Sequence, residues 1–171
     1  MKDFSHVFAM LALSTALGVA VAQAGADTGA LAVQEAQLRI ALAPTPAIVV
    51  REPGDLRLRY PVRQAFAADQ AALLPAGRAM LDLVAASLRQ FDHTRIDVAV
   101  YTDAIGRVEF NRQQSQLRAS AVVAYLHSRG VGSVRLIARG VGKEAPLDAE
   151  NTPEGRDLNR RLELVITPLS S

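Results

Sequence analysis

Residues 96–119 read IDVAVYTDAIGRVEFNRQQSQLRA and join two periodic patterns through a short polar turn. The first residues of this stretch alternate within an apolar run, which predicts a strand over residues 95–102. From Asn111 onward the pattern predicts a helix to residue 129, stopped by Gly130, a residue favoured just after a helix C-terminus. We therefore expect the polar residues of the turn to lie where a strand meets the helix that follows it.

A set of polar side chains gathers at this junction. Asp103 closes the predicted strand, and Asn111, Ser115 and Arg118 occupy positions i, i+4 and i+7 of one helix face. A guanidinium can hold a carboxylate through two hydrogen bonds, while a carboxylate can hold an ammonium group. The residues therefore predict a binding site for a zwitterion. The alternative interpretation is an asparagine that caps the helix, a loop aspartate and a solvated arginine.

The loop over residues 146–161 is the second candidate part of the site. Arg156 and Arg160 lie one helical turn apart, so both can present donors toward Asp103. The alternative is that these arginines, with Arg161, make structural ion pairs with neighbouring carboxylates. The candidate carboxylates are Glu154, Asp157 and Glu163.

The rest of the chain predicts an α/β fold. The second strand of a hairpin begins a βαβαβ order that one further strand follows, which predicts an α+β sandwich with a mixed sheet and helices packed on one face. The expected strands cover residues 48–50, 56–60, 95–102, 134–140 and 162–166. The expected helices cover residues 74–90, 111–129 and 153–158.

Composition excludes several functions. The 171 residues include 19 basic and 17 acidic residues, and the resulting net charge of +2 is too balanced for a nucleic-acid-binding surface. The histidines, His6, His93 and His127, have no acid or nucleophile at a catalytic spacing, and no cluster of metal ligands is present. We expect a non-enzymatic protein without a metal or a cofactor.

The N-terminus predicts export. Residues 7–21 are nearly all apolar and precede Ala22-Gln23-Ala24, the small-x-small pattern of a signal-peptidase site. We expect a signal peptide over residues 1–24 that is cleaved after Ala24, which places the protein in the periplasm. An uncleaved membrane anchor is the alternative, although the apolar stretch is shorter than the roughly 20 residues of a spanning helix.

The chain between the signal peptide and the domain is expected to be a linker over residues 25–47. Its residues Leu31 to Leu42 have a short apolar stripe at helical spacing, which predicts a marginal, frayed helix or a helix that binds a partner. The folded domain is expected over residues 48–168, followed by a tail over residues 169–171.

From residue 66 to residue 166 the sequence resembles the C-terminal periplasmic domain of the OmpA family, the OmpA/MotB-like peptidoglycan-binding module. The resemblance is carried by motifs in matching order and spacing. These motifs are FAAD at 66–69, TDxxG at 102–106, NxxxSxxRA at 111–119, GV at 130–131, RLxxxGxGxxxP at 135–146 and NxxxGRxxNRRLE at 151–163.

The resemblance implies non-catalytic binding of the peptidoglycan stem peptide. Diaminopimelate, whose far end bears both an ammonium and a carboxylate, would be held by Asp103 and Arg118, with further contacts from Asn111 and Arg160. Secondary candidates are Thr102, Ser115 and Arg156. Such a protein would tether an envelope component to the cell wall, with an envelope or outer-membrane protein as a partner and peripheral association with the outer membrane.

The sequence departs from the family pattern at two places. Val100 and Tyr101 stand where the family usually has Gly-His before Thr-Asp, and Gln114 replaces the usual Leu before Ser115. We expect Val100 and Tyr101 to crowd or reshape the floor of the pocket. The alternative function is therefore an envelope adaptor that keeps the fold but binds the wall weakly or not at all.

Overall fold

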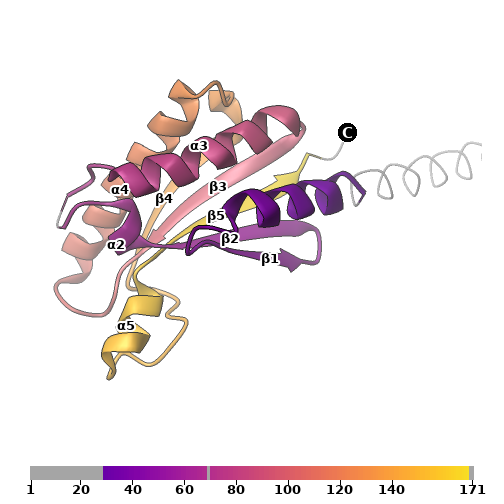
Figure 1. The fold of residues 1–171 in the computed structure, drawn as a ribbon. Coiled ribbons are helices and arrows are strands. Elements are labelled where there is room, and N and C mark those ends of the chain that lie inside the picture. Colours follow the sequence, from indigo (N-terminus) through magenta and orange to yellow (C-terminus); the bar gives the residue numbers. More distant parts are fainter. Residues whose placement is uncertain (1–28, 69, 170–171) are drawn as a thin grey trace, which may run out of the picture.

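The computed structural model describes residues 29–68 and 70–169, so the predicted signal peptide lies outside the described residues. One sheet with the strand order β1-β2-β5-β3-β4 forms the framework (Figure 1). Its strands are β1 (Ile48–Glu52), β2 (Asp55–Pro61), β3 (Thr94–Tyr101), β4 (Leu136–Gly142) and β5 (Arg161–Pro168).

The C-terminal strand holds the sheet together. β5 lies at its centre and pairs antiparallel with both β2 and β3, whereas β3 and β4 pair in parallel through the crossover between them. The β1–β2 hairpin turns between Glu52 and Asp55, as the sequence predicted. The sheet is therefore mixed, and the predicted fold class is confirmed.

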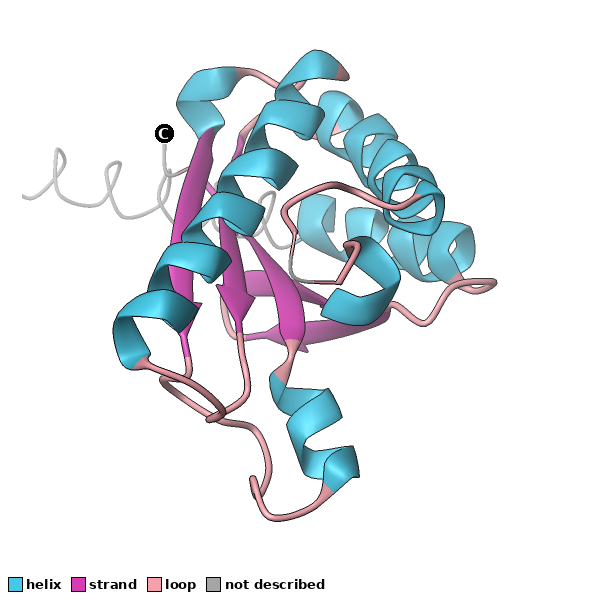
Figure 2. Cartoon of the chain, turned by 90° about the vertical axis from the view of Figure 1, so that its left-hand side faces the viewer, coloured by secondary structure: helices cyan, strands magenta, loops and turns pink. Residues whose placement is uncertain are grey.

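The long helices cover one face of this sheet. α3 (Pro75–Gln90) and α4 (Val108–Ser128) pack on the same side, with α5 (Pro153–Asn159) below the strands at the opposite end from the C-terminus (Figures 1 and 2). A short α2 (Val62–Ala65) and a 3₁₀ turn, η1 (Ser133–Arg135), complete the order. The sequence did not predict α2, because a single turn of helix is too short to establish a periodic pattern.

Strand alternation explains which side of the sheet is covered. Along β2, Leu56, Leu58 and Tyr60 point into the core, while Arg57 and Arg59 point to the other face. The helical face of the core is formed by Leu81, Val84, Ala85 and Leu88 of α3, all fully buried, as the helical spacing predicted. The opposite face of the sheet carries a charged network in place of a second layer of helices.

The stretch before the hairpin belongs to the core. Residues 29–42 are helical, and Leu31, Leu38 and Leu42 are buried in the same hydrophobic cluster as the sheet. The amide of Gln34 donates to the hydroxyl of Ser87 on α3 at 3.3 Å. The prediction of a marginal helix in a linker is therefore corrected. Its apolar stripe lacks a partner in the local sequence but packs beside α3, and the folded unit begins before Ile48.

A close approach between α4 and β4 depends on Gly140. A Cβ atom at this position would lie 2.2 Å from the Gln116 nitrogen and 2.7 Å from the Arg112 carbonyl oxygen, both of which are backbone atoms. Gly140→Ala is expected to lower the free energy of unfolding by about 1–3 kcal/mol, because the helix must move off the strand. Gly132→Ala is the control, since its nearest neighbour is the flexible Arg135 side chain at 3.8 Å. Equal midpoints for both variants in urea unfolding would contradict this reading of the contact.

Candidate functional site

A pocket of about 320 Å³ opens at the junction between β3 and α4. It contains most of the residues that the sequence predicted as a site, together with an apolar rim. Its lining residues are Thr102, Asp103, Ile105, Gly106, Phe110, Asn111, Gln114, Arg118 and Arg160. The side chains of Ile105 and Phe110 are large, apolar and exposed. The pocket thus combines one carboxylate and two guanidinium groups with apolar surface.

The loop after β3 is fixed by hydrogen bonds at both ends. The amide of Thr102 donates to the Gly142 carbonyl at 2.8 Å, which extends the pairing of β3 with β4 into the loop. Gly106 has a φ of +92°, a conformation that glycine adopts without a steric cost. The side-chain amide of Asn111 donates to the Ile105 carbonyl at 2.8 Å. Asn111 therefore lines the pocket while holding the loop that carries Asp103.

The start of α4 differs from the prediction. The helix begins at Val108, so Asn111 lies at the end of the first turn and does not cap the helix. Asn111 is therefore not the helix cap of the alternative interpretation, and it is not wholly available to a ligand either. The residue is 6% exposed and its side-chain amide donates to the protein, so less of it is free to contact a ligand than the spacing suggested.

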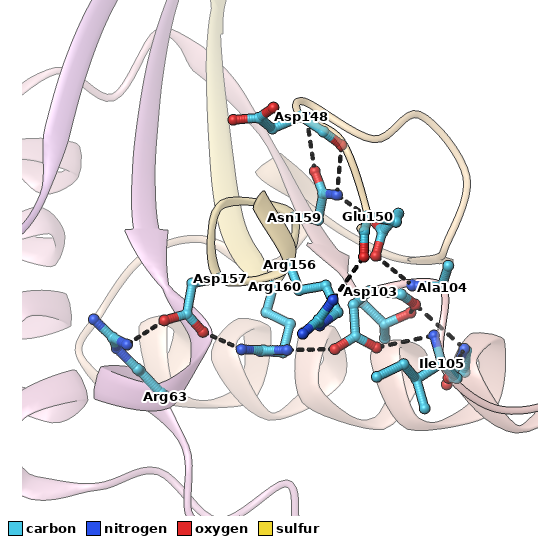
Figure 3. A network of polar contacts seen from close by, with 12 residues as sticks. Arg63, Asp103, Ala104, Ile105, Asp148, Glu150, Arg156, Asp157, Asn159 and Arg160 are labelled. Carbon is cyan, nitrogen blue, oxygen red and sulfur yellow. Dashed lines mark hydrogen bonds and ion pairs between the residues drawn. The ribbon is translucent and has the colours of Figure 1, made fainter. Parts of the chain in front are cut away.

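The carboxylate of Asp103 is held in place from two directions. One oxygen accepts the backbone amide of Ile105 at 3.2 Å, and the other accepts Nη1 of Arg160. Arg160 also pairs with Asp157, which in turn pairs with Arg63 of α2 (Figure 3). Burial acts to lower the pKa of Arg160, but the hydrogen bonds that its guanidinium donates to the two carboxylates outweigh burial and raise the pKa. The guanidinium therefore stays charged.

Arg118 lies on α4 and also lines the pocket. Its Nε donates to the Gln70 carbonyl at 3.0 Å, and its guanidinium carbon lies 5.6 Å from the centroid of the Phe66 ring. These contacts come from the segment between α2 and α3, far from Asp103 in the sequence. They orient the guanidinium along the pocket wall.

Two of the secondary candidates lie outside the pocket. Ser115 is fully buried, and its hydroxyl donates to the Arg112 carbonyl at 2.9 Å and accepts the Gly142 amide at 3.0 Å. Arg156 donates to the Glu150 carbonyl at 2.7 Å and is not a lining residue. Both residues shape the surrounding backbone. The helix face of Asn111 and Ser115 turns toward the sheet, whereas Arg118 lies on its flank.

Asn159, which lies beside Arg160 in the sequence, is a supporting residue of the site. It is fully buried at the end of α5, where its Oδ1 accepts the amides of Leu147 and Asp148 at 2.7 and 3.1 Å. Its Nδ2 also bonds to Glu150, whose other carboxylate oxygen accepts the Ala104 amide at 3.0 Å (Figure 3). Asn159 thereby ties the loop before α5 to the loop that carries Asp103. The sequence signal for this supporting role is the asparagine of the NRR triplet at 159–161.

The expected crowding of the pocket by Val100 and Tyr101 is wrong. Val100 is fully buried in the core cluster, and neither residue lines the pocket. Tyr101 points to the other face of the sheet, where the Arg161 guanidinium lies 3.6 Å from the centroid of its ring. Strand alternation separates the two side chains, and the pocket is built from the residues that follow them.

The described residues offer little support for other kinds of site. Over 29–68 and 70–169, no group of three or more histidines and carboxylates is arranged to hold a metal ion. His93 is highly exposed and lies outside the pocket, and the ring of His127 bonds to the Val131 carbonyl at 3.2 Å. Within the same residues, every helix is too short or too polar to cross a membrane.

The sequence matches one family model and is similar to several known proteins. Residues 65–160 match the model of the OmpA family. The protein named Probable lipoprotein YiaD of Escherichia coli (strain K12) is 36% identical over 137 residues, which are 80% of this chain and 63% of YiaD. Peptidoglycan-binding protein ArfA of Mycobacterium tuberculosis (strain H37Rv) is 38% identical over 102 residues, which are 60% of this chain and 31% of ArfA. The chain therefore spans less than two thirds of either relative.

A solved structure agrees with these matches. A MotB-like protein from Desulfovibrio vulgaris superposes with a TM-score of 0.75 at 25% identity, and the match covers 84% of this chain and 95% of that protein. The superposition reaches beyond the part of the chain matched by the family model.

Proposed function

Because the chain belongs to the OmpA family, we propose that it binds peptidoglycan through the pocket between β3 and α4 and holds the diaminopimelate of the stem peptide there. The name of the similar ArfA protein supports wall binding as the general function. Membership in a family of non-catalytic binding domains confirms the prediction that the protein is not an enzyme. A periplasmic location next to the cell wall follows from the proposed ligand.

The observation that carries this proposal is that one pocket contains both Asp103 and Arg118. Each carboxylate oxygen of Asp103 has two lone pairs, and the bonds from Ile105 and Arg160 leave one on each oxygen. An ammonium group of the ligand can therefore join Asp103 without displacing Arg160. Arg118 then donates two parallel hydrogen bonds to the carboxylate at the same end of diaminopimelate.

The charge balance of the pocket favours an anionic ligand that carries one ammonium group. Among the residues that line the pocket, Arg118 and Arg160 carry two positive charges and Asp103 carries one negative charge, while Asp157, which also pairs with Arg160, does not line it. A stem peptide with free carboxylates complements this excess, because opposite charges across an interface raise the association rate and reject partners of the wrong charge. A lysine in place of diaminopimelate would bring no carboxylate of its own to Arg118, so the site is expected to discriminate between the two peptides.

A pair of aspartates tests the proposal. Asp103 and Asp97 have equally exposed side chains, 13% in each case, and both pair with an arginine, but Asp97 faces the opposite side of the sheet. Asp103→Asn is expected to abolish pull-down of the protein with diaminopimelate-type sacculi, while Asp97→Asn leaves it intact. Calorimetry with the isolated stem peptide gives the affinities. Wild-type binding by Asp103→Asn would refute the site, and failure of the unaltered protein to bind sacculi would refute the function.

A further inference from the structure

Gln114 is a polar residue of the pocket that the protein itself does not use. It lies on α4 one turn after Phe110 and one turn before Arg118, and all three side chains line the pocket. The Gln114 side chain is half-buried, and among the described residues it makes no hydrogen bond or ion pair with the protein.

Its neighbours in the sequence behave differently. Gln116 accepts the Gly140 amide at 2.7 Å and donates to the Ala138 carbonyl at 3.4 Å, so its amide fastens α4 to β4. Gln113 is exposed and lies outside the pocket. Gln114 is thus the glutamine of this helix that offers both an amide donor and a carbonyl acceptor to a bound molecule beside Arg118.

The two groups recognise different forms of a carboxyl group. Arg118 has donors alone and prefers a charged carboxylate, which accepts two hydrogen bonds. A carboxamide is neutral and has one acceptor and two donors, so it fits a guanidinium poorly. A second carboxamide can pair with it reciprocally, through one N–H···O bond in each direction. Gln114 supplies such a group one helical turn from Arg118 in the same pocket.

On the basis of the proposed function, we propose that Gln114 contacts the same carboxyl group of the ligand as Arg118 and lets the site accept stem peptides whose diaminopimelate is amidated there. With a free carboxylate, Arg118 provides the main contact and Gln114 adds one donor. With a carboxamide, Gln114 forms the reciprocal pair and offsets the lost ionic contact. Gln114 is therefore a specificity-determining residue for the amidation state of the wall.

Calorimetry on the full chain with two stem tripeptides tests this role. The peptides differ only in whether that diaminopimelate carboxyl group is free or amidated. The unaltered protein is expected to bind both, with the amidated form weaker by less than about tenfold. Gln114→Leu is expected to weaken binding of the amidated peptide at least about fivefold and of the free acid less than about threefold, since two hydrogen bonds are lost in the first case and one in the second.

A charged variant sharpens the test and a neighbour controls it. Gln114→Glu is expected to weaken binding of the free acid more than of the amide, because a second carboxylate repels the first and can still accept from the amide. Gln113→Leu is expected to leave both affinities unchanged.

The outcomes separate this inference from the proposed function. If the unaltered protein binds the free acid but the ratio of the two affinities is the same in Gln114→Leu and Gln114→Glu, the role of Gln114 is wrong and wall binding stands. If the unaltered protein binds neither peptide, the proposed function fails and this inference with it.

Discussion

Replacing Arg118 by alanine is expected to lower the affinity for the diaminopimelate stem peptide at least about thirtyfold. Truncation of one member of a hydrogen-bonded charge pair costs about 2–5 kcal/mol, and the lower value corresponds to that factor. The cost is large because the ligand carboxylate would remain partly desolvated without its guanidinium partner. Arg118 also donates to the Gln70 carbonyl, so the variant is expected to lose about 0.5–1.5 kcal/mol of stability as well.

Two further variants separate charge from geometry. Arg118→Lys keeps the positive charge but cannot form two parallel hydrogen bonds, so it is expected to bind nearly as weakly as the alanine variant. Arg112→Ala removes an exposed arginine of the same helix that does not line the pocket, and its affinity is expected to stay within about threefold of the unaltered protein. Calorimetry at one fixed salt concentration compares all of them. If Arg118→Ala binds as Arg112→Ala does, Arg118 is not part of the site.

Replacing Glu163 by alanine is expected to destabilise the fold by about 3–5 kcal/mol, the cost of breaking a buried ion pair by removing one partner. Glu163 is 1% exposed on the open face of the sheet and accepts hydrogen bonds from three arginines. These are Arg57 at 2.6 Å, Arg161 at 2.8 Å and Arg59 at 3.0 Å. Without the carboxylate, the buried Arg161 loses its counter-ion and the three cations repel one another.

The same residue makes stability depend on pH. Burial acts to raise the pKa of Glu163, but hydrogen bonds from Arg161 and Arg57 outweigh it and hold the pKa below the ordinary value of 4.5. The unfolded chain therefore binds more protons, and the stabilisation is complete above about pH 4.5 and is lost as the pH falls toward the folded-state pKa. Urea unfolding at several pH values measures the loss, which Glu163→Gln should reduce. Glu144→Ala, an exposed loop variant, is expected to change stability by less than about 0.5 kcal/mol.

The elements of the domain were predictable because their patterns are local. Alternation along β2, β3 and β5 and the apolar face of α3 follow from the periods of strands and helices, and most boundaries agree within a few residues. The helix over residues 29–42 was not predictable as part of the core, because the contacts that bury it are not local. Its stripe is as short as in a frayed helix, and Leu38 is buried only in the core cluster formed by residues remote in the sequence.

The candidate site likewise has residues that the sequence predicts and residues whose position only the packing decides. Asp103 and Arg118 were found from the sequence because they flank one strand–helix junction, and the pocket contains both. The different position of Ser115 was not predictable. The i, i+4, i+7 spacing gives a common face, but which edge of that face meets the sheet depends on how α4 packs on β4.

The charged strand β5 shows most clearly what the sequence alone does not determine. The sequence Arg161-Leu-Glu163-Leu establishes a strand with one apolar face, since side chains alternate with a period of two. Whether the charged face is solvated cannot be read from that alternation. In the structure β5 lies between β2 and β3, so arginines of β2 cover Glu163 and turn a surface pattern into a buried ion network. Local periodicity sets the direction of each side chain, whereas strand order, which joins distant segments, sets what each side chain meets.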